Sequence, residues 1–240
     1  MKVSAAENLL HDFRVEYKKT RALIRLSTKL KIPAALKDLY SAAGKVRELQ
    51  LIRHTLLQLT TEEKIPRYIS LLNQKYTTAT EQLKKEAGLN HHNSIKKLQH
   101  QLPVKLSKKK AAGFVNKQLH HLTLLIQVKK NKEAHLHEAR KLVKDLLYTF
   151  NILRQSGFKK SIPFTRQFIE QWYVLSDELG KFQDLCNFLL YLKQVSFIQS
   201  SPEENNLLKQ IKADYLQIKN QKKKIIFSTL TTLLARNQPI

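Results

Sequence analysis

Two segments about half a chain apart repeat one pattern, and this repeat constrains the fold more than any other feature. The first segment reads HDFRVEYKKTR and the second HEARKLVKDLLYTF. Because an α-helix turns by about 100° per residue, the leading histidine and several following cations share an arc of about 80° in each segment. The first stripe is formed by His11, Arg14, Lys18, Arg21 and Arg25. The second is formed by His137, Arg140, Lys144 and Tyr148, with Lys141 at its edge. Each segment therefore predicts a helix with one rigid cationic stripe.

Two further matches follow in the same order along the chain. AAGKVREL resembles ELGKFQDL, and NQKYTTATEQL more weakly resembles NQKKKIIFSTL. The matches align Gly44 with Gly180, Lys45 with Lys181, Glu48 with Asp184, and Lys75 with Lys222. Three landmarks in one order predict an internal duplication. We therefore expect residues 1–240 to form a single domain made of two repeats, at about 1–110 and 111–240.

The composition favours an all-α fold. Only five Gly and six Pro occur in 240 residues, whereas the strong helix formers Leu, Lys, Gln, Glu and Ala are frequent. No strand-like alternation stands out. Helices are expected at about residues 4–30, 33–59, 66–86, 114–155 with a break near Asn131, 164–199 and 203–235. Residues 88–112 are interpreted as a connector or a short irregular helix, and SGFKKSIP as a turn. Ser201 and Pro202 suit the cap and first position of the last helix.

The net charge indicates an anionic partner. Lys and Arg number 43 against 19 Asp and Glu, which leaves a formal charge of +24. Such a surplus attracts nucleic acid, anionic lipid, acidic protein or inorganic polyphosphate. A basic helical face that is merely solvated explains one stripe equally well. Repetition of the stripe, with histidine leading both copies, favours a binding site.

Several other kinds of site are not expected. The single cysteine, Cys186, excludes an internal disulfide framework and a cysteine-rich zinc site, and suits a reducing compartment. The histidine doublets at 91–92 and 120–121 point to different sides of a helix, so we expect no metal site. The sequence has no nucleotide-binding glycine loop. No nucleophile or paired carboxylate lies at a spacing related to the stripe histidines. We therefore predict no enzyme activity and no cofactor.

The N-terminal residues lack the apolar stretch of a secretory signal, and no apolar run approaches about 18 residues. We expect a soluble, cytoplasmic protein with no membrane insertion.

On the two histidine-led segments and the Gly-Lys-x-x-acid segments at Gly44 and Gly180, the chain resembles the CHAD family. The resemblance extends from His11 to about Leu234. It implies a pair of pseudo-symmetric four-helix bundle repeats, related by a pseudo-two-fold, around a shared basic groove or channel that binds inorganic polyphosphate. The chain resembles a stand-alone form, because it has no room for a CYTH domain and lacks the acidic metal-binding strands of that domain.

The candidate polyphosphate-binding residues combine the two stripes with basic residues of the other matched segments. They are His11, Arg14, Lys18, Lys19, Arg21, Arg25, Lys45, Arg47, Lys75, His137, Arg140, Lys141, Lys144, Lys181, Lys219, Lys222 and Lys223. Leu147 and Gln183 stand at the positions of the second half that match Arg21 and Arg47, so we expect weaker ligand contact from the second half. His11 and His137 are interpreted either as hydrogen-bond donors to phosphate or as hydrogen-bond donors that hold a helix contact.

Two smaller expectations concern residues outside the ligand set. Glu48 and Asp184 are expected to orient neighbouring cations rather than bind metal. Phe168, Trp172 and Tyr173 are expected to pack in the core, which makes them poor platforms for nucleic-acid bases.

The predicted function is non-catalytic binding of inorganic polyphosphate, with localisation to polyphosphate granules as one role for it. The first alternative is a sequence-independent nucleic-acid-binding protein, because phosphate backbones present similar charges. The second is a polyphosphate hydrolase, which would need an acidic metal-binding cluster that the sequence does not offer. The sequence leaves the oligomeric state open.

Overall fold

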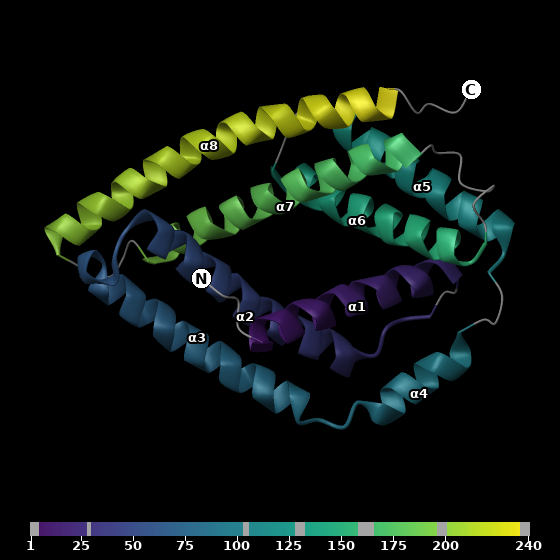
Figure 1. Ribbon diagram of the computed structural model, residues 1–240, viewed down its shortest axis with the longest axis horizontal. Coiled ribbons are helices and arrows are strands. Elements are labelled where there is room, and N and C mark those ends of the chain that lie inside the picture. Colours follow the sequence, from purple (N-terminus) through teal and green to yellow (C-terminus); the bar gives the residue numbers. More distant parts are fainter. Residues whose placement is uncertain are drawn as a thin grey trace. The chain divides into compact units, whose positions relative to one another are not determined.

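The computed structural model describes residues 5–27, 30–102, 106–127, 133–157, 166–195 and 201–235. Within these ranges the regular structure is entirely helical, with no strand, which confirms the all-α prediction (Figure 1). The elements are α1 (Ala5–Ser27), α2 (Ala34–Leu59), a short 3-10 turn η1 (Glu62–Lys64), α3 (Pro66–Ala87), α4 (His92–Gln101), α5 (Lys108–Gln127), α6 (Glu133–Gln155), α7 (Arg166–Val195) and α8 (Pro202–Ala235).

Prolines and caps set several helix boundaries as predicted. Pro33 directly precedes α2, and Pro66 is the first residue of α3. At the start of α8, the hydroxyl of Ser201 accepts a hydrogen bond from the backbone N–H of Glu204 at 3.2 Å, with Pro202 in the first position. Proline suits this place because a first-turn N–H has no partner within the helix.

The region predicted as a connector contains the short helix α4 and the start of α5. Helix α5 begins at Lys108, earlier than the expected Phe114. The Ser107 hydroxyl accepts a hydrogen bond from the Lys110 N–H at 3.4 Å and so caps the helix. The expected break near Asn131 lies outside the described residues, as does most of the expected turn after Gly157.

The contacts divide the chain into two compact units, and each unit is discontinuous in sequence. Unit 1 comprises Met1–Tyr17, Ile32–Leu98 and Asp184–Asn220. Unit 2 comprises Lys18–Lys31, Gln99–Gln183 and Gln221–Ile240. Helices α1, α7 and α8 each contribute to both units, so each unit draws residues from both predicted repeats. The pseudo-two-fold relation between the repeats stays a prediction.

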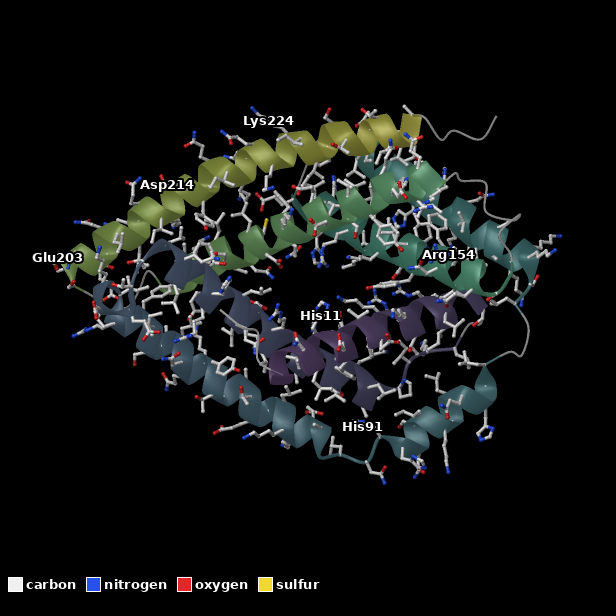
Figure 2. The ribbon with its side chains drawn as sticks, in the orientation of Figure 1. His11, His91, Arg154, Glu203, Asp214 and Lys224 are labelled. Carbon is white, nitrogen blue, oxygen red and sulfur yellow. The ribbon has the colours of Figure 1, made fainter. Side chains whose placement is uncertain are left out.

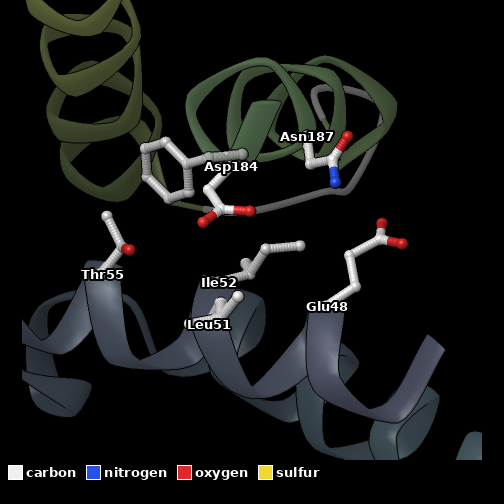
Figure 3. Close-up of a pocket in the computed structure, with 7 residues that line it drawn as sticks. Glu48, Leu51, Ile52, Thr55, Asp184 and Asn187 are labelled. Atoms are coloured by element: carbon white, nitrogen blue, oxygen red, sulfur yellow. The ribbon is translucent and has the colours of Figure 1, made fainter. Parts of the chain in front are cut away.

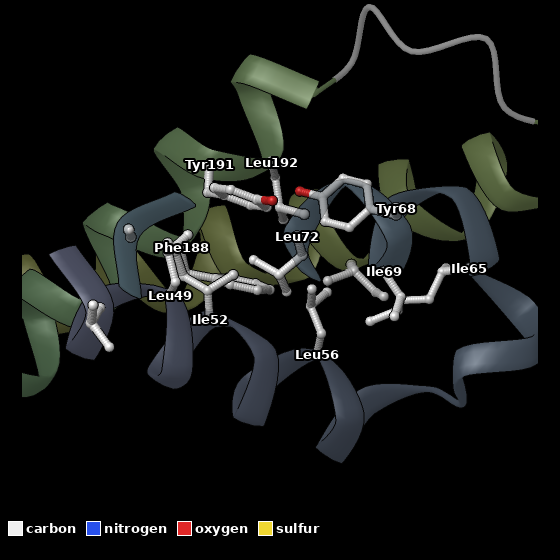
Figure 4. Close-up of a cluster of buried hydrophobic side chains, with 13 residues drawn as sticks. Leu49, Ile52, Leu56, Ile65, Tyr68, Ile69, Leu72, Phe188, Tyr191 and Leu192 are labelled. Atoms are coloured by element: carbon white, nitrogen blue, oxygen red, sulfur yellow. The ribbon is translucent and has the colours of Figure 1, made fainter. Parts of the chain in front are cut away.

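The core of unit 1 is built from α2, α3, α7 and α8 (Figure 4). Its apolar side chains recur at helical spacing on each element, which buries one face of every helix. The cluster contains Val46, Leu49, Ile52, Leu56, Ile65, Tyr68, Ile69, Leu72, Ala79, Phe188, Tyr191, Leu192 and Ile211. Tyr68 and Tyr191 meet edge to face, with ring centroids 5.5 Å apart. This geometry suits the charge distribution of aromatic rings.

A buried carboxylate closes one end of this core. Glu204 is 3 % exposed, and its side-chain oxygen accepts a hydrogen bond from the backbone N–H of Tyr68 at 3.0 Å. That N–H belongs to the first turn of α3, where backbone donors lack partners within the helix and a negative charge is favoured. Glu204 therefore links the starts of α3 and α8 within unit 1.

In unit 2, α6 and α7 carry most of the buried side chains. Helix α6 buries Leu136, Ala139, Leu142, Val143, Leu146, Leu147, Phe150 and Leu153. On α7, Trp172 and Phe168 are buried as predicted, with ring centroids 5.6 Å apart.

One prediction of burial is wrong. Tyr173 is 43 % exposed, and its hydroxyl accepts a hydrogen bond from the Asn151 amide at 2.7 Å. It follows Trp172 directly, and the helical rotation of about 100° between the two residues carries its side chain toward solvent.

Candidate anion-binding site

In unit 1, Arg14 of α1 is held against α2. Its Nη1 donates a hydrogen bond to the backbone carbonyl of Tyr40 at 3.1 Å, and its guanidinium carbon lies 4.6 Å from the centre of the Tyr40 ring. The ring of Tyr17 stacks on the ring of Tyr40, with centroids 4.2 Å apart. A hydrogen bond and a cation–π contact together fix the position of this guanidinium.

Gly44 makes room for Arg14. A Cβ atom placed at Gly44 would overlap the Arg14 Nη1 atom. This close approach explains a glycine inside α2, where it costs about 1 kcal/mol relative to alanine. The matched glycine of α7, Gly180, would have no atom within 4 Å of an added Cβ, so close packing does not explain it.

This difference predicts opposite results for two alanine substitutions. We expect Gly44→Ala to displace the Arg14 guanidinium and to weaken polyphosphate binding, with a small effect on stability because a flexible side-chain end can move. Gly180→Ala should raise the free energy of unfolding by about 1 kcal/mol and leave binding unchanged. Urea unfolding and a binding titration measure both. Equal polyphosphate affinities for the two variants would mean that Arg14 does not contact the ligand.

Three other predicted cations of unit 1, Lys45, Arg47 and Lys75, also contact side chains of the protein. Lys45 pairs with Glu48 at 3.3 Å, which confirms that Glu48 orients a neighbouring cation. Arg47 donates a hydrogen bond to the Gln50 side chain at 3.4 Å. The ammonium of Lys75 lies 4.9 Å from the centre of the Tyr191 ring. His11 is exposed on α1, where it is labelled in Figure 2.

In unit 2, two arginines of the first stripe share a buried acid that the sequence analysis missed. Asp145 of α6 is 1 % exposed. Its Oδ1 lies 3.2 Å from the Arg21 Nη2, and its Oδ2 accepts a hydrogen bond from the Arg25 Nη1. The Arg25 side chain remains 51 % exposed and that of Arg21 25 % exposed. Both arginines therefore have a structural role besides any contact with a ligand.

The sequence carried little signal for this pairing. Asp145 directly precedes Leu146 and Leu147, but at about 100° per residue it lies next to Lys141 at the edge of the second stripe rather than in the middle of the apolar face. A carboxylate at such a border can lie in solvent, so its burial was not predicted. The identity of the partners could not be read from the sequence, because more than a hundred residues separate them.

Helix α6 presents the second stripe differently from the first. The Nδ1 of His137 is hydrogen-bonded to the Gln183 side chain at 2.5 Å, so the structure gives this histidine one protein partner. Lys141 pairs with Glu138 at 3.1 Å.

Arg140 and Lys144 lie one turn apart on α6, both half-buried. Burial lowers the pKa of Lys144, and the positive charge of Arg140 lowers it further, whereas Asp177 opposes both effects. The Arg140 Nε is buried without a hydrogen-bond partner among the described residues. Two like charges in a partly buried place would be stabilised by a bound anion.

Carboxylates meet two predicted cations of unit 2, Lys181 of α7 and Lys222 of α8. Lys181 lies 2.8 Å from Asp177 and 2.9 Å from Glu178. Lys222 lies 2.8 Å from the other oxygen of Glu178. Hydrogen bonds from Lys222 and Lys181 hold the pKa of Glu178 below its usual value.

The candidate residues are distributed over both units. Unit 1 contains His11, Arg14, Lys45, Arg47, Lys75 and Lys219. Unit 2 contains Lys18, Lys19, Arg21, Arg25, His137, Arg140, Lys141, Lys144, Lys181, Lys222 and Lys223. Each unit thus has its own group of cations, and a groove shared by both groups stays a prediction.

A small cavity in unit 1 is lined by apolar side chains and by two carboxylates. Glu48 extends from α2 and Asp184 from α7 toward the same space, so two acids matched by the repeat come together (Figure 3). The cavity measures about 120 Å³ and is also lined by Leu51, Ile52, Thr55, Asn187 and Phe188. Its carboxylates make it unsuitable for phosphate. Among the described residues, no three His, Cys, Asp or Glu side chains gather as a metal site.

Comparisons with known proteins agree with the resemblance seen in the sequence. A comparison with curated proteins gave no match. Across the described part of the chain, none of the helices combines the length and apolarity needed to cross a bilayer. The family model described as CHAD domain matches residues 3–189, which is more than half of the 240 residues. The chain therefore belongs to the CHAD domain family.

Proposed function

We propose that this protein binds inorganic polyphosphate without catalysing a reaction. The CHAD domain family is associated with polyphosphate binding. The observation that carries the proposal for this chain is the pair Arg140 and Lys144. These two half-buried cations lie one turn apart on α6. Burial lowers the pKa of Lys144, and the positive charge of Arg140 lowers it further. A multivalent anion between them removes the penalty on the charged form.

The chemistry of the cations suits a phosphate chain. A guanidinium donates two parallel hydrogen bonds to phosphate oxygens, and an ammonium acts as a mobile point charge. The candidate residues supply both kinds of group in each unit. A linear polyphosphate carries oxygens on every phosphate, so one polyphosphate molecule can bind many such side chains at once.

We propose binding alone because the candidate ligand contacts are lysine, arginine and histidine side chains, and the carboxylates near them form ion pairs with these cations. Hydrolysis requires an activated nucleophile or a metal-bound water in addition. Retention of the protein on polyphosphate granules would follow directly from such binding.

Sequence-independent nucleic-acid binding is the second candidate, favoured by the net charge of +24. A competition at fixed salt tests the two. Labelled long-chain polyphosphate is bound first, and unlabelled polyphosphate, single-stranded DNA or double-stranded DNA is then added at equal phosphate concentration. We expect polyphosphate to compete best, and log affinity to fall linearly with log salt. Stronger competition by either DNA would overturn the proposal.

A further inference from the structure

Glu178 of α7 lies between two of the predicted phosphate-binding lysines. Its Oε1 accepts a hydrogen bond from the Lys181 ammonium at 2.9 Å, and its Oε2 accepts one from the Lys222 ammonium at 2.8 Å. The Glu178 side chain is 34 % exposed. All three residues belong to unit 2. One carboxylate therefore occupies two cations at a place that solvent reaches.

The same network extends to the second stripe. Asp177 also pairs with Lys181 at 2.8 Å, and its charge partly opposes the lowering of the pKa of Lys144 by burial and by Arg140. Two lysines are thus paired with these two carboxylates, and Lys144 is influenced by the charge of Asp177. The network keeps a positive surplus, but its carboxylates already satisfy the ammonium groups of α7 and α8.

From this arrangement we propose that Glu178 is a resident counter-anion that determines which anions the unit 2 cations bind. The inference rests on the proposed function. An incoming ligand must replace the Glu178 oxygens at Lys181 and Lys222. A small anion with one or two charges gains little from that exchange, because it only substitutes one anion for another. A polyphosphate contacts the neighbouring cations at the same time, so it gains more than the carboxylate provides.

A purely structural role is the competing explanation. The Lys222 pair links α8 to α7 within unit 2, and Glu178 could serve only to hold the two helices together. Pairs as exposed as these contribute little to stability. If Glu178 is a counter-anion, removing its charge should change the affinity for anions. If its role is structural, removing the charge should change the stability of the protein.

Glu178→Gln tests the inference, with Glu170→Gln as a matched control. Glu170 lies on the same helix and in the same unit, and it pairs with Arg166 at 2.9 Å where both side chains are well exposed. Both substitutions raise the net charge by one, but only Glu178→Gln removes a carboxylate that pairs with two predicted phosphate-binding lysines. The probes are orthophosphate, sodium tripolyphosphate and long-chain polyphosphate at one salt concentration, measured by calorimetry, with urea unfolding in parallel.

We expect Glu178→Gln to bind tripolyphosphate about three- to tenfold more tightly than the wild type. Orthophosphate binding should become measurable in this variant. Glu170→Gln should change affinity by less than about twofold, because its charge is screened and distant from the network. Asp177→Asn, which removes the other partner of Lys181, should act in the same direction as Glu178→Gln.

Equal affinities for Glu178→Gln and Glu170→Gln, or weaker binding by Glu178→Gln, would overturn the inference and leave the proposed function intact. Lower stability of Glu178→Gln with unchanged affinity would do the same and assign Glu178 a structural role. Absence of polyphosphate binding in both wild type and Glu178→Gln would overturn the inference and the proposed function together. Binding by Glu178→Gln alone would support the counter-anion and contradict the function proposed for the wild type.

Discussion

Replacing Arg21 and Arg25 together with methionine should lower the free energy of unfolding by about 3–5 kcal/mol. The loss arises because the carboxyl of Asp145, 1 % exposed, would be left buried without either partner. Replacing Asp145 alone should cost less, since the arginines it leaves behind are partly exposed and can be hydrated. Urea unfolding followed by circular dichroism measures each change.

Adding Asp145→Leu to the two arginine changes should restore most of the lost stability, because the buried charge is then gone. The control is Arg53→Met, which breaks an exposed pair with Glu62 and should cost at most about 1 kcal/mol. Additive losses in the triple variant would contradict the pairing. The triple variant also isolates ligand contact: if it folds normally, any remaining loss of polyphosphate affinity reports direct binding by Arg21 and Arg25.

Replacing Arg14 and Lys18 with alanine should weaken polyphosphate binding by about a hundredfold or more, at roughly 1.5–3 kcal/mol for each charged hydrogen bond lost. Replacing Arg140 and Lys144 should weaken it less. In the second half, Leu147 and Gln183 stand at the positions that match Arg21 and Arg47 of the first half. Carboxylates also already neutralise several cations near Arg140 and Lys144. Affinity at fixed salt, with circular dichroism to verify folding, tests both double variants.

The matched control for these variants is Arg154→Ala with Lys224→Ala. Both side chains are exposed, both lie outside the predicted site, and the change in net charge is the same (Figure 2). We expect a loss below about threefold from the general reduction in charge. Wild-type affinity in either test variant would remove that part of the stripe from the site. A control that loses as much affinity as the Arg14 variant would mean that only total charge matters.

The sequence by itself determined the features that depend on local chemistry. Helix content followed from the residues present, and Ser201 and Pro202 marked the start of α8 because a cap needs only neighbouring backbone groups. The cationic stripes were visible because helical spacing fixes which residues share a face. Family membership followed from the same short motifs, and the match to residues 3–189 agrees with it.

Only the tertiary structure decided which charges meet. Periodicity places Arg21 and Arg25 on one face, but the position of α6 against α1 gives them Asp145 as a partner. The role of Gly44 likewise depends on where Arg14 reaches α2.

The division of α1, α7 and α8 between two units follows from packing as well, and no repeat boundary in the sequence predicted it. A helix can continue through such a division, because its backbone hydrogen bonds are local and do not depend on which core its side chains enter. Charges and apolar faces find partners far away along the chain. The sequence therefore determined the helices and their charged faces, and the packing of distant helices decided which of those charges are neutralised within the protein.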